Sequence, residues 1–326
     1  MGKDGSNKMK LVIVGAGGRL GAALVREYRD KHQVTGFNRD QLDLSNLQDV
    51  RETLRATDFD VLINAAAFTN VDRCETERDS AFLINGEAPG VLATICRDKG
   101  AKMIHFSTDY VFDGQKRAAY TEDDEPNPIS AYGESKLAGE KNVLAANDEH
   151  LVVRVSWVFG PDRPSFVDAM IKRAQESDTV DAIADKFSTP TYTLDVALML
   201  PRFFPSAAVA GIGHRGRATV ARRHAVVTDH GYSARDYQGI LHFANAGECS
   251  WQEYAQSALD CCQRIGLALK TIAVGGSKLK DMSSWLARRP VYSVLSTAKY
   301  TKLTDMPPRA WREAVADYIT RFYSTK

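Results

Sequence analysis

Two short segments hold polar residues whose types and spacing suit the reduction of a carbonyl group. Tyr132 and Lys136 are four residues apart, so on a helix they lie on one face. An ammonium beside a phenol, together with the ribose of a nucleotide cofactor, lowers the phenol pKa toward neutrality. Such a phenol can protonate a carbonyl oxygen as a hydride reaches the carbon, and a hydroxyl of Ser107 or Thr108 can hydrogen-bond the same oxygen. A surface pair without a chemical role is the alternative for this spacing alone.

A glycine-rich turn earlier in the chain predicts a dinucleotide site. Residues 15–21 follow an aliphatic run and have the pattern G-x-x-G-x-x-G. Glycines let backbone amides approach a pyrophosphate, and the positive N-terminus of the next helix favours the same anion. The residues expected to contact the cofactor in this turn are Gly15, Gly17, Gly18, Arg19, Leu20 and Gly21.

The end of the second predicted strand bears on the choice between NADP and NAD. An acidic residue there would bind the ribose 2′-hydroxyl and repel a 2′-phosphate. The chain instead has Asn38 and Arg39, and a guanidinium suits phosphate, so NADPH is favoured, while Asp40 keeps NADH open. Small residues follow the third predicted strand, where the cofactor would cross the sheet: Ala65, Ala66 and Ala67. Ser107, Tyr132 and Lys136 complete the expected cofactor contacts.

Strands and helices must alternate to position these residues. Aliphatic runs predict strands at 10–14, 34–37, 61–64, 103–106 and 151–155. Helical spacing predicts helices at 20–29, 50–56, 80–99 and 132–146. This alternation predicts an α/β fold with a Rossmann-type doubly wound parallel sheet.

The pattern changes after about residue 157, where prolines and polar loops become frequent. We expect residues 1–158 to form the NADP-binding domain and residues 159–326 to form mainly a smaller substrate-binding domain. Segments near 191–210 and 239–244 are expected to return to the sheet. An insertion at about 205–237 includes an Arg/His-rich stretch, 211–230, for which a solvated surface loop is favoured over a phosphate-binding loop.

Composition excludes several classes of function. The 326 residues carry a formal net charge of +1, so no global field attracts nucleic acid or an anionic membrane. The five cysteines form no C-x-x-C pair, so neither a metal site nor a disulfide framework is expected. No apolar run approaches the roughly 20 residues of a membrane helix. The cytoplasm is the expected location, and the polar residues 1–8 are interpreted as a leader without structure.

Taken together, these motifs resemble the dTDP-4-dehydrorhamnose reductases, a family of extended short-chain dehydrogenases. The similarity rests on the Gly turn and on segments 64–72, 105–112, 126–140, 156–159, 190–191, 250–251 and 287–295. It implies that NADPH reduces dTDP-4-dehydro-L-rhamnose to dTDP-L-rhamnose. It also implies catalytic roles for Thr108, Tyr132 and Lys136, and adenine contacts for Asp43 and Leu44. The substrate contacts that it implies are Thr69, Val71, Thr108, Asp109, Tyr110, Trp157 and either Arg288 or Arg289.

Departures from the family pattern lie in the substrate half. The family's Q-x-G-x-P-T stretch has Lys186 and Ser188 at its first and third positions, and Ser165 replaces an asparagine before Phe166. They leave the identity of the sugar open. A related nucleotide-sugar reductase or epimerase is one alternative, and a non-catalytic NADP-binding subunit like the regulatory β subunit of methionine adenosyltransferase is another. A homodimer is compatible with the sequence.

Overall fold

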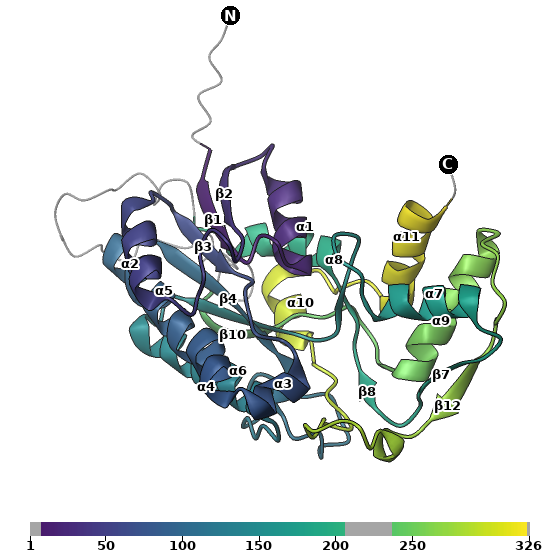
Figure 1. Cartoon of the computed structure of the whole chain (residues 1–326). Coiled ribbons are helices and arrows are strands. Elements are labelled where there is room, and N and C mark those ends of the chain that lie inside the picture. Colours follow the sequence, from purple (N-terminus) through teal and green to yellow (C-terminus); the bar gives the residue numbers. More distant parts are fainter. Residues whose placement is uncertain (1–7, 206–236, 325–326) are drawn as a thin grey trace, which may run out of the picture.

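A computed structural model of the chain describes residues 8–205 and 237–324. The Arg/His-rich stretch at 211–230 lies outside the described residues. Figure 1 shows a larger lobe around a central sheet and a smaller lobe beside it. Among the described residues no helix is both long and apolar enough to cross a membrane.

The central sheet has six parallel strands in the order β10-β5-β4-β3-β1-β2. Their bounds are β1 Lys10–Val14, β2 Gln33–Phe37, β3 Val61–Asn64, β4 Lys102–Thr108, β5 Leu151–Val155 and β10 Gly239–His242. Val14 at the end of β1 lies opposite both Phe37 and Asn64, so the segments after these strands leave the sheet at one edge. The strand order reverses at β1 and β3, and the crevice outside such a switch point is where ligands bind in open α/β sheets.

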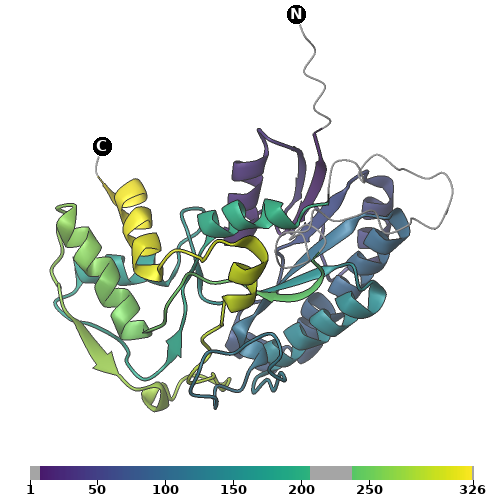
Figure 2. The ribbon, with the colours of Figure 1, turned by 180° about the vertical axis from the view of Figure 1, so that it is seen from behind.

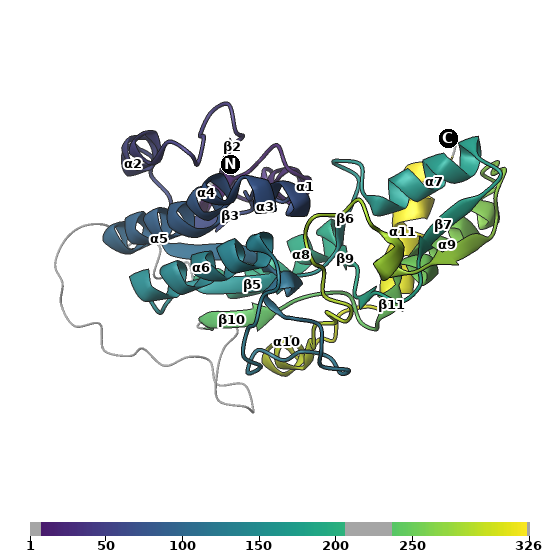
Figure 3. The same cartoon turned by 60° about the horizontal axis from the view of Figure 1, so that its bottom comes forward.

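Helices cover both faces of this sheet, which confirms the predicted α/β fold class. Three pack on one face: α1 Arg19–Tyr28, α8 Thr193–Met199 and α10 Ala298–Thr304. Three others pack on the opposite face: α2 Leu47–Ala56, α5 Ala88–Lys99 and α6 Ala131–Ala146. Figure 3 shows α5 and α6 on one side of the sheet and α10 on the other.

The predicted helix over 80–99 is wrong in its middle. The segment consists of α4 Arg78–Phe82, a π-helical turn η1 at Leu83–Glu87, and α5. The turn directs Asn85 inward, where its amide accepts a hydrogen bond from the Phe68 backbone N–H at 2.8 Å and donates to the Phe68 carbonyl at 3.0 Å. The same side chain donates to Ser135 Oγ of α6 at 3.1 Å. Asn85 thus ties the segment after β3 to α6.

The smaller lobe has its own apolar core, in which three helices pack together: α7 Phe166–Glu176, α9 Trp251–Arg264 and α11 Trp311–Tyr323. The strands β7 Val180–Ile183 and β12 Val274–Ser277 pair in parallel at its edge. Ser165 with Asp168, and Ser250 with Glu253, form capping boxes that begin α7 and α9. These capping residues were local signals for helices that our sequence analysis did not place.

The chain crosses between the lobes more than once. Figure 2 shows green β10 and yellow α10 against the larger lobe. The expectation of a returning strand is met at β10, which pairs with β5. Residues 194–204 also pack on the sheet, but as α8 and a 3₁₀ turn rather than as a strand. Their apolar side chains follow a helical period, since Val196, Leu200 and Phe203 all face the core.

Candidate active site

A cavity of about 590 Å³ opens at the sheet edge where β1 to β5 end. Its size is typical of a small-molecule site. The segments after four strands line it with residues that the sequence singled out: Gly15, Gly17, Gly18, Arg19, Leu20, Asn38, Arg39, Asp43, Leu44, Ala65, Ala66, Ala67, Thr69, Ser107, Tyr132 and Lys136. The structure therefore brings the glycine turn and the Tyr–Lys pair to one cavity.

The glycine turn has the shape that a dinucleotide phosphate requires. Gly15 has a φ of +84°, and a Cβ on it would come 2.6 Å from the Ala66 amide nitrogen. Gly21 is not among the cavity residues, because it packs under the turn, where a Cβ would come 2.1 Å from the Gly15 carbonyl oxygen. The helix α1 thus begins directly behind the turn. Gly18, Arg19 and Leu20 at its start line the cavity, and the first amides of a helix have no partner within the helix and favour anions.

The part of the cavity rim that follows β2 carries Arg39. Its side chain is 80% exposed, and its Nε lies 3.6 Å from Asp43 Oδ2. Hydrogen bonds from the backbone N–H and the hydroxyl of Ser45 hold the pKa of Asp43 below its usual value, with Arg39 adding to the effect. An exposed pair of this length is weak, so the guanidinium is free to turn toward a ligand. Asp40 lines the same rim.

Tyr132 and Lys136 stand on the first turns of α6. The helix is capped by Ser130, whose Oγ accepts from the Gly133 N–H at 3.3 Å. Lys136 is buried, and its ammonium donates to the Phe106 carbonyl at 2.7 Å. Burial lowers the pKa of Lys136 to about 8.

The lowered pKa predicted for Tyr132 depends on Lys136 together with a cofactor ribose, whereas the surrounding protein by itself acts in the opposite direction. The Lys136 ammonium donates to a carbonyl of β4. Burial raises the pKa of the Tyr132 phenol above the usual value, and the neighbouring Thr108 hydroxyl offsets only part of this. The phenol is therefore the protonated species at neutral pH.

Thr108, which ends β4, is oriented by its neighbour Asp109. The Thr108 hydroxyl donates to Asp109 Oδ1 at 3.1 Å. The other oxygen, Oδ2, accepts from the hydroxyls of Ser156 at 2.9 Å, Ser188 at 3.1 Å and Ser293 at 2.6 Å. Asp109 was predicted to contact the substrate, and it is only 3% exposed. Its carboxylate holds Thr108 and three serines instead.

Both departures from the Q-x-G-x-P-T pattern lie beside this carboxylate. Ser188 donates to Asp109 directly. Lys186 is buried, donates to the Pro290 carbonyl at 2.9 Å, and lies 5.3 Å from the centre of the Tyr110 ring. Burial lowers the pKa of Lys186 to about 8, although Asp109 opposes the shift. Lys186 and Ser188 thus pack against the Thr108–Tyr110 segment.

Trp157 joins an aromatic cluster of the smaller lobe. Its ring centre lies 5.5 Å from that of Phe166, 5.0 Å from that of Trp251 and 5.0 Å from that of Tyr254. Its φ of 49° is unusual for a residue with a side chain. A positive φ strains the backbone of a residue with a side chain, and strain of this kind occurs mostly at functional sites.

The two arginines near the C-terminal motif have different surroundings. Arg289 is paired with Asp72 at 2.8 Å and lies 3.7 Å from the centre of the Trp285 ring, whereas Arg288 is exposed. Val71 begins the short helix α3 Val71–Thr76, beside this pair. Neither Arg288 nor Val71 is among the residues that line the described cavity.

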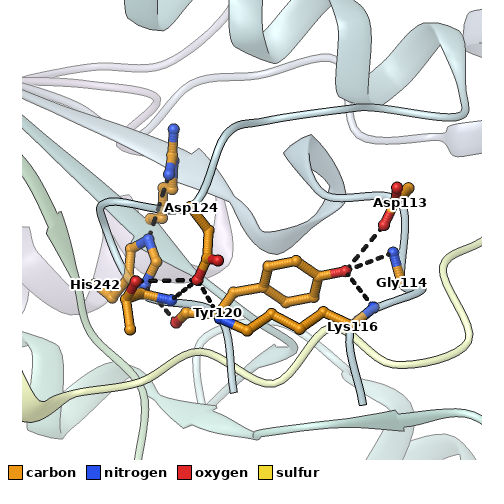
Figure 4. A network of polar contacts seen from close by, with 8 residues as sticks. Asp113, Gly114, Lys116, Tyr120, Asp124 and His242 are labelled. Carbon is orange, nitrogen blue, oxygen red and sulfur yellow. Dashed lines mark hydrogen bonds and ion pairs between the residues drawn. The ribbon is translucent and has the colours of Figure 1, made fainter. Parts of the chain in front are cut away.

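The loop that joins Thr108 to Tyr132 is fixed by Tyr120. Figure 4 shows its hydroxyl toward Asp113, Gly114 and Lys116 and its backbone toward His242. The hydroxyl donates to Asp113 Oδ1 at 2.9 Å and accepts from the amides of Gly114 and Lys116, each at 3.1 Å. The Tyr120 carbonyl lies 3.2 Å from His242 Nδ1 of β10. One side chain therefore organises the loop from inside.

We expect Tyr120→Phe to lower the free energy of unfolding by about 1–3 kcal/mol, because two partly buried amides lose their acceptor. Urea unfolding followed by circular dichroism measures this change. Tyr237→Phe is the matched control, since the Tyr237 hydroxyl donates to the Ile240 carbonyl within its own segment. An equal loss in the two variants would show that the loop does not depend on the three-partner hydroxyl.

Comparison with protein families shows to which family the chain belongs. The family model described as RmlD substrate binding domain matches residues 9–217 and 214–324. The chain belongs to this family. Its relatives include dTDP-4-dehydrorhamnose reductase of Burkholderia thailandensis, 33% identical over 94% of this chain and 97% of that protein. The enzyme of the same name from Mycolicibacterium smegmatis is 35% identical over 95% of this chain and 85% of that protein.

Solved structures of the RmlD family have the same fold. The dTDP-4-dehydrorhamnose reductase of Clostridium acetobutylicum matches with a TM-score of 0.82 and 30% identity over 97% of this chain and 100% of that chain. The Bacillus anthracis protein of that name, in complex with NADP, matches with a TM-score of 0.81 and 27% identity over 96% of this chain and 99% of that chain. The predicted family and fold are confirmed.

Several cavity residues of this RmlD-family chain escaped the sequence analysis. They are Leu42, Phe68, Ile84, Phe106, Val155, Val158 and Arg163. Most are apolar residues at or near strand ends. The predicted strands give their positions in the sheet but do not show that their side chains line the cavity. Arg163 differs, because it comes from the loop between β6 (Val158–Phe159) and α7, in the half assigned to substrate.

Proposed function

We propose that this RmlD-family protein uses NADPH to reduce the C4 keto group of a dTDP-linked 4-keto-6-deoxy sugar, converting dTDP-4-dehydro-L-rhamnose to dTDP-L-rhamnose. The observation that carries the proposal is the placement of Tyr132, Lys136 and the glycine turn around one cavity. The names of the relatives and the NADP complex of a structural neighbour support the same activity.

The cavity fits the cofactor, because any side chain at Gly15 would clash with the backbone of Ala65 and Ala66. The glycine turn would hold the pyrophosphate, Arg39 the 2′-phosphate, Asp43 and Leu44 the adenine, and Ala65–Ala67 the stretch across the sheet. NADPH supplies the hydride when bound there.

The residues of the chain supply the proton and the orientation. Tyr132, whose phenol carries its proton at neutral pH, donates that proton to the carbonyl oxygen, which becomes the new hydroxyl. Thr108, whose hydroxyl donates to Asp109 in this structure, would turn that donor to the carbonyl oxygen of the bound sugar. Lys136 stays fixed through the Phe106 carbonyl and would bind the cofactor ribose.

The substrate would lie between the lobes, with Thr69, Val71, Tyr110 and Trp157 around the sugar and Arg288 at the diphosphate. Asp109 would act on it only through Thr108. This arrangement includes the division into a dinucleotide-binding part, residues 1–158 with β10, and a mainly substrate-binding part, residues 159–326. We also propose that the protein is a homodimer and acts in the cytoplasm.

The test follows the near-ultraviolet absorbance of reduced nicotinamide when purified protein is mixed with NADPH and dTDP-4-dehydro-L-rhamnose. We expect the absorbance to fall in proportion to the sugar added, with dTDP-L-rhamnose, which has no keto group, as the inactive control. Net consumption of NADPH excludes an epimerase that returns its hydride. Tight binding of NADPH without consumption would contradict the reductase and favour a non-catalytic role.

A further inference from the structure

We propose that Arg163, together with Arg39, binds the 2′-phosphate of NADPH, an inference that rests on the proposed function. The two arginines come from distant parts of the sequence. Arg39 follows β2, and Arg163 lies in the loop between β6 and α7. Both line the same cavity.

Arg163 is anchored to the glycine turn itself. Its Nε donates to the Gly17 carbonyl at 2.9 Å. A Cβ placed on Gly17 would lie 3.4 Å from Asn38 Cβ and 3.9 Å from Arg163 Nη2. The guanidinium therefore lies where the turn meets the residues that follow β2. Within residues 8–205 and 237–324, neither Nη nitrogen of Arg163 has a hydrogen bond or an ion pair, so two donors remain for a ligand.

The loop that carries Arg163 is fastened to α1 by two other arginines. Arg19 donates to the Val158 carbonyl at 3.1 Å and to the Arg163 carbonyl at 3.2 Å, and it also donates to the Pro164 carbonyl. Arg26 forms an ion pair with Asp162. Arg19 lines the cavity, but its guanidinium is committed to this loop. These contacts hold the backbone of Arg163 in place, and its guanidinium remains available to a ligand.

The acidic residues around Arg39 make a second cation necessary for binding a phosphate there. Arg39 stands beside Asp40 and Asp43, so these three residues together carry one negative charge. A phosphate monoester adds about 1.5–2 negative charges near neutral pH. Arg39 alone would leave this rim strongly repulsive, whereas Arg163 brings a fork of N–H donors that matches phosphate geometry. NADH has no 2′-phosphate and gains nothing from this fork.

The experiment compares the dissociation constants of NADPH and NADH for wild type and Arg163→Ala by fluorescence titration. We expect Arg163→Ala to weaken NADPH binding about tenfold, the effect of losing one charge-assisted contact, and NADH binding by less than about twofold. Arg39→Ala should show the same selective loss. Arg173→Ala removes the same charge from an exposed position of α7 and should change neither constant.

The outcomes separate this inference from the proposed function. An equal loss of NADPH and NADH binding in Arg163→Ala would place the arginine on the pyrophosphate and overturn the proposal. An unchanged NADPH constant, in Arg163→Ala and in the charge-reversed Arg163→Glu, would also overturn it. A wild-type protein that binds neither dinucleotide would instead contradict the proposed function. Arg163 is exposed, so these variants are expected to fold.

Discussion

Replacement of Tyr132 by Phe should lower kcat about 10²–10⁴-fold, the usual contribution of a general acid, and leave the dissociation constant of NADPH nearly unchanged. The substitution removes one hydroxyl from a ring that packs edge-on against Tyr110, with 5.6 Å between ring centres. The shape of the cavity is therefore kept while the proton donor is lost. Steady-state oxidation of NADPH by the keto sugar and a fluorescence titration of NADPH measure the two quantities.

Tyr292→Phe is the matched control, because it removes a phenolic hydroxyl that pairs with Glu248 outside the cavity. We expect it to keep wild-type kcat. Equal activity in Tyr132→Phe and wild type would rule out the proposed acid. A large loss of NADPH affinity in Tyr132→Phe would show that the hydroxyl serves binding rather than proton transfer.

Arg154→Met should lower the free energy of unfolding by about 3–5 kcal/mol, because it leaves a buried carboxylate without its cation. Arg154 and Glu140 have side chains that are 1% and 2% exposed, and two hydrogen bonds of 2.9 and 2.6 Å join them. Glu140 also accepts from the Ser107 hydroxyl at the end of β4. Urea unfolding of the variant and of wild type measures the loss.

Two further variants test the reason for that loss. Arg97→Met removes an arginine that pairs with Asp98 at the surface and should cost less than about 1 kcal/mol. The double variant Arg154→Met/Glu140→Leu removes both charges and should recover part of the stability. If the double variant is less stable than Arg154→Met alone, the buried pair does not act through its unpaired charge.

Three strands were predicted well because they are buried along nearly their whole length. The runs 10–14, 61–64 and 151–155 coincide with β1, β3 and β5, since short runs of mostly aliphatic residues are typical of strands buried on both faces. The smaller lobe was harder. Its helices are amphipathic, and the prolines around them suggested loops, although Ser165 and Ser250 begin regular helices.

The site was predictable where motifs are local and not where contacts join distant residues. The glycine turn and the Tyr–Lys pair are contiguous patterns, so their cavity positions followed from the sequence. The hydroxyls that donate to Asp109 Oδ2 belong to Ser156, Ser188 and Ser293. These serines are far apart in the sequence and follow no motif that would have connected them. Arg163 reaches the glycine turn across 146 residues, a contact that only the folded chain reveals.

Because of the π-helical turn at Leu83–Glu87, the structure of the cavity wall depends on the number of residues in this segment. A regular helix advances about 100° per residue, so loss of one residue here would rotate Asn85 or all of α5 by that angle. Asn85 holds both backbone groups of Phe68, which lines the cavity. Exchange of side chains can therefore be tolerated along much of this helix during divergence, whereas a change of length cannot. Among descendants of one ancestor, this stretch should drift in composition while keeping its number of residues.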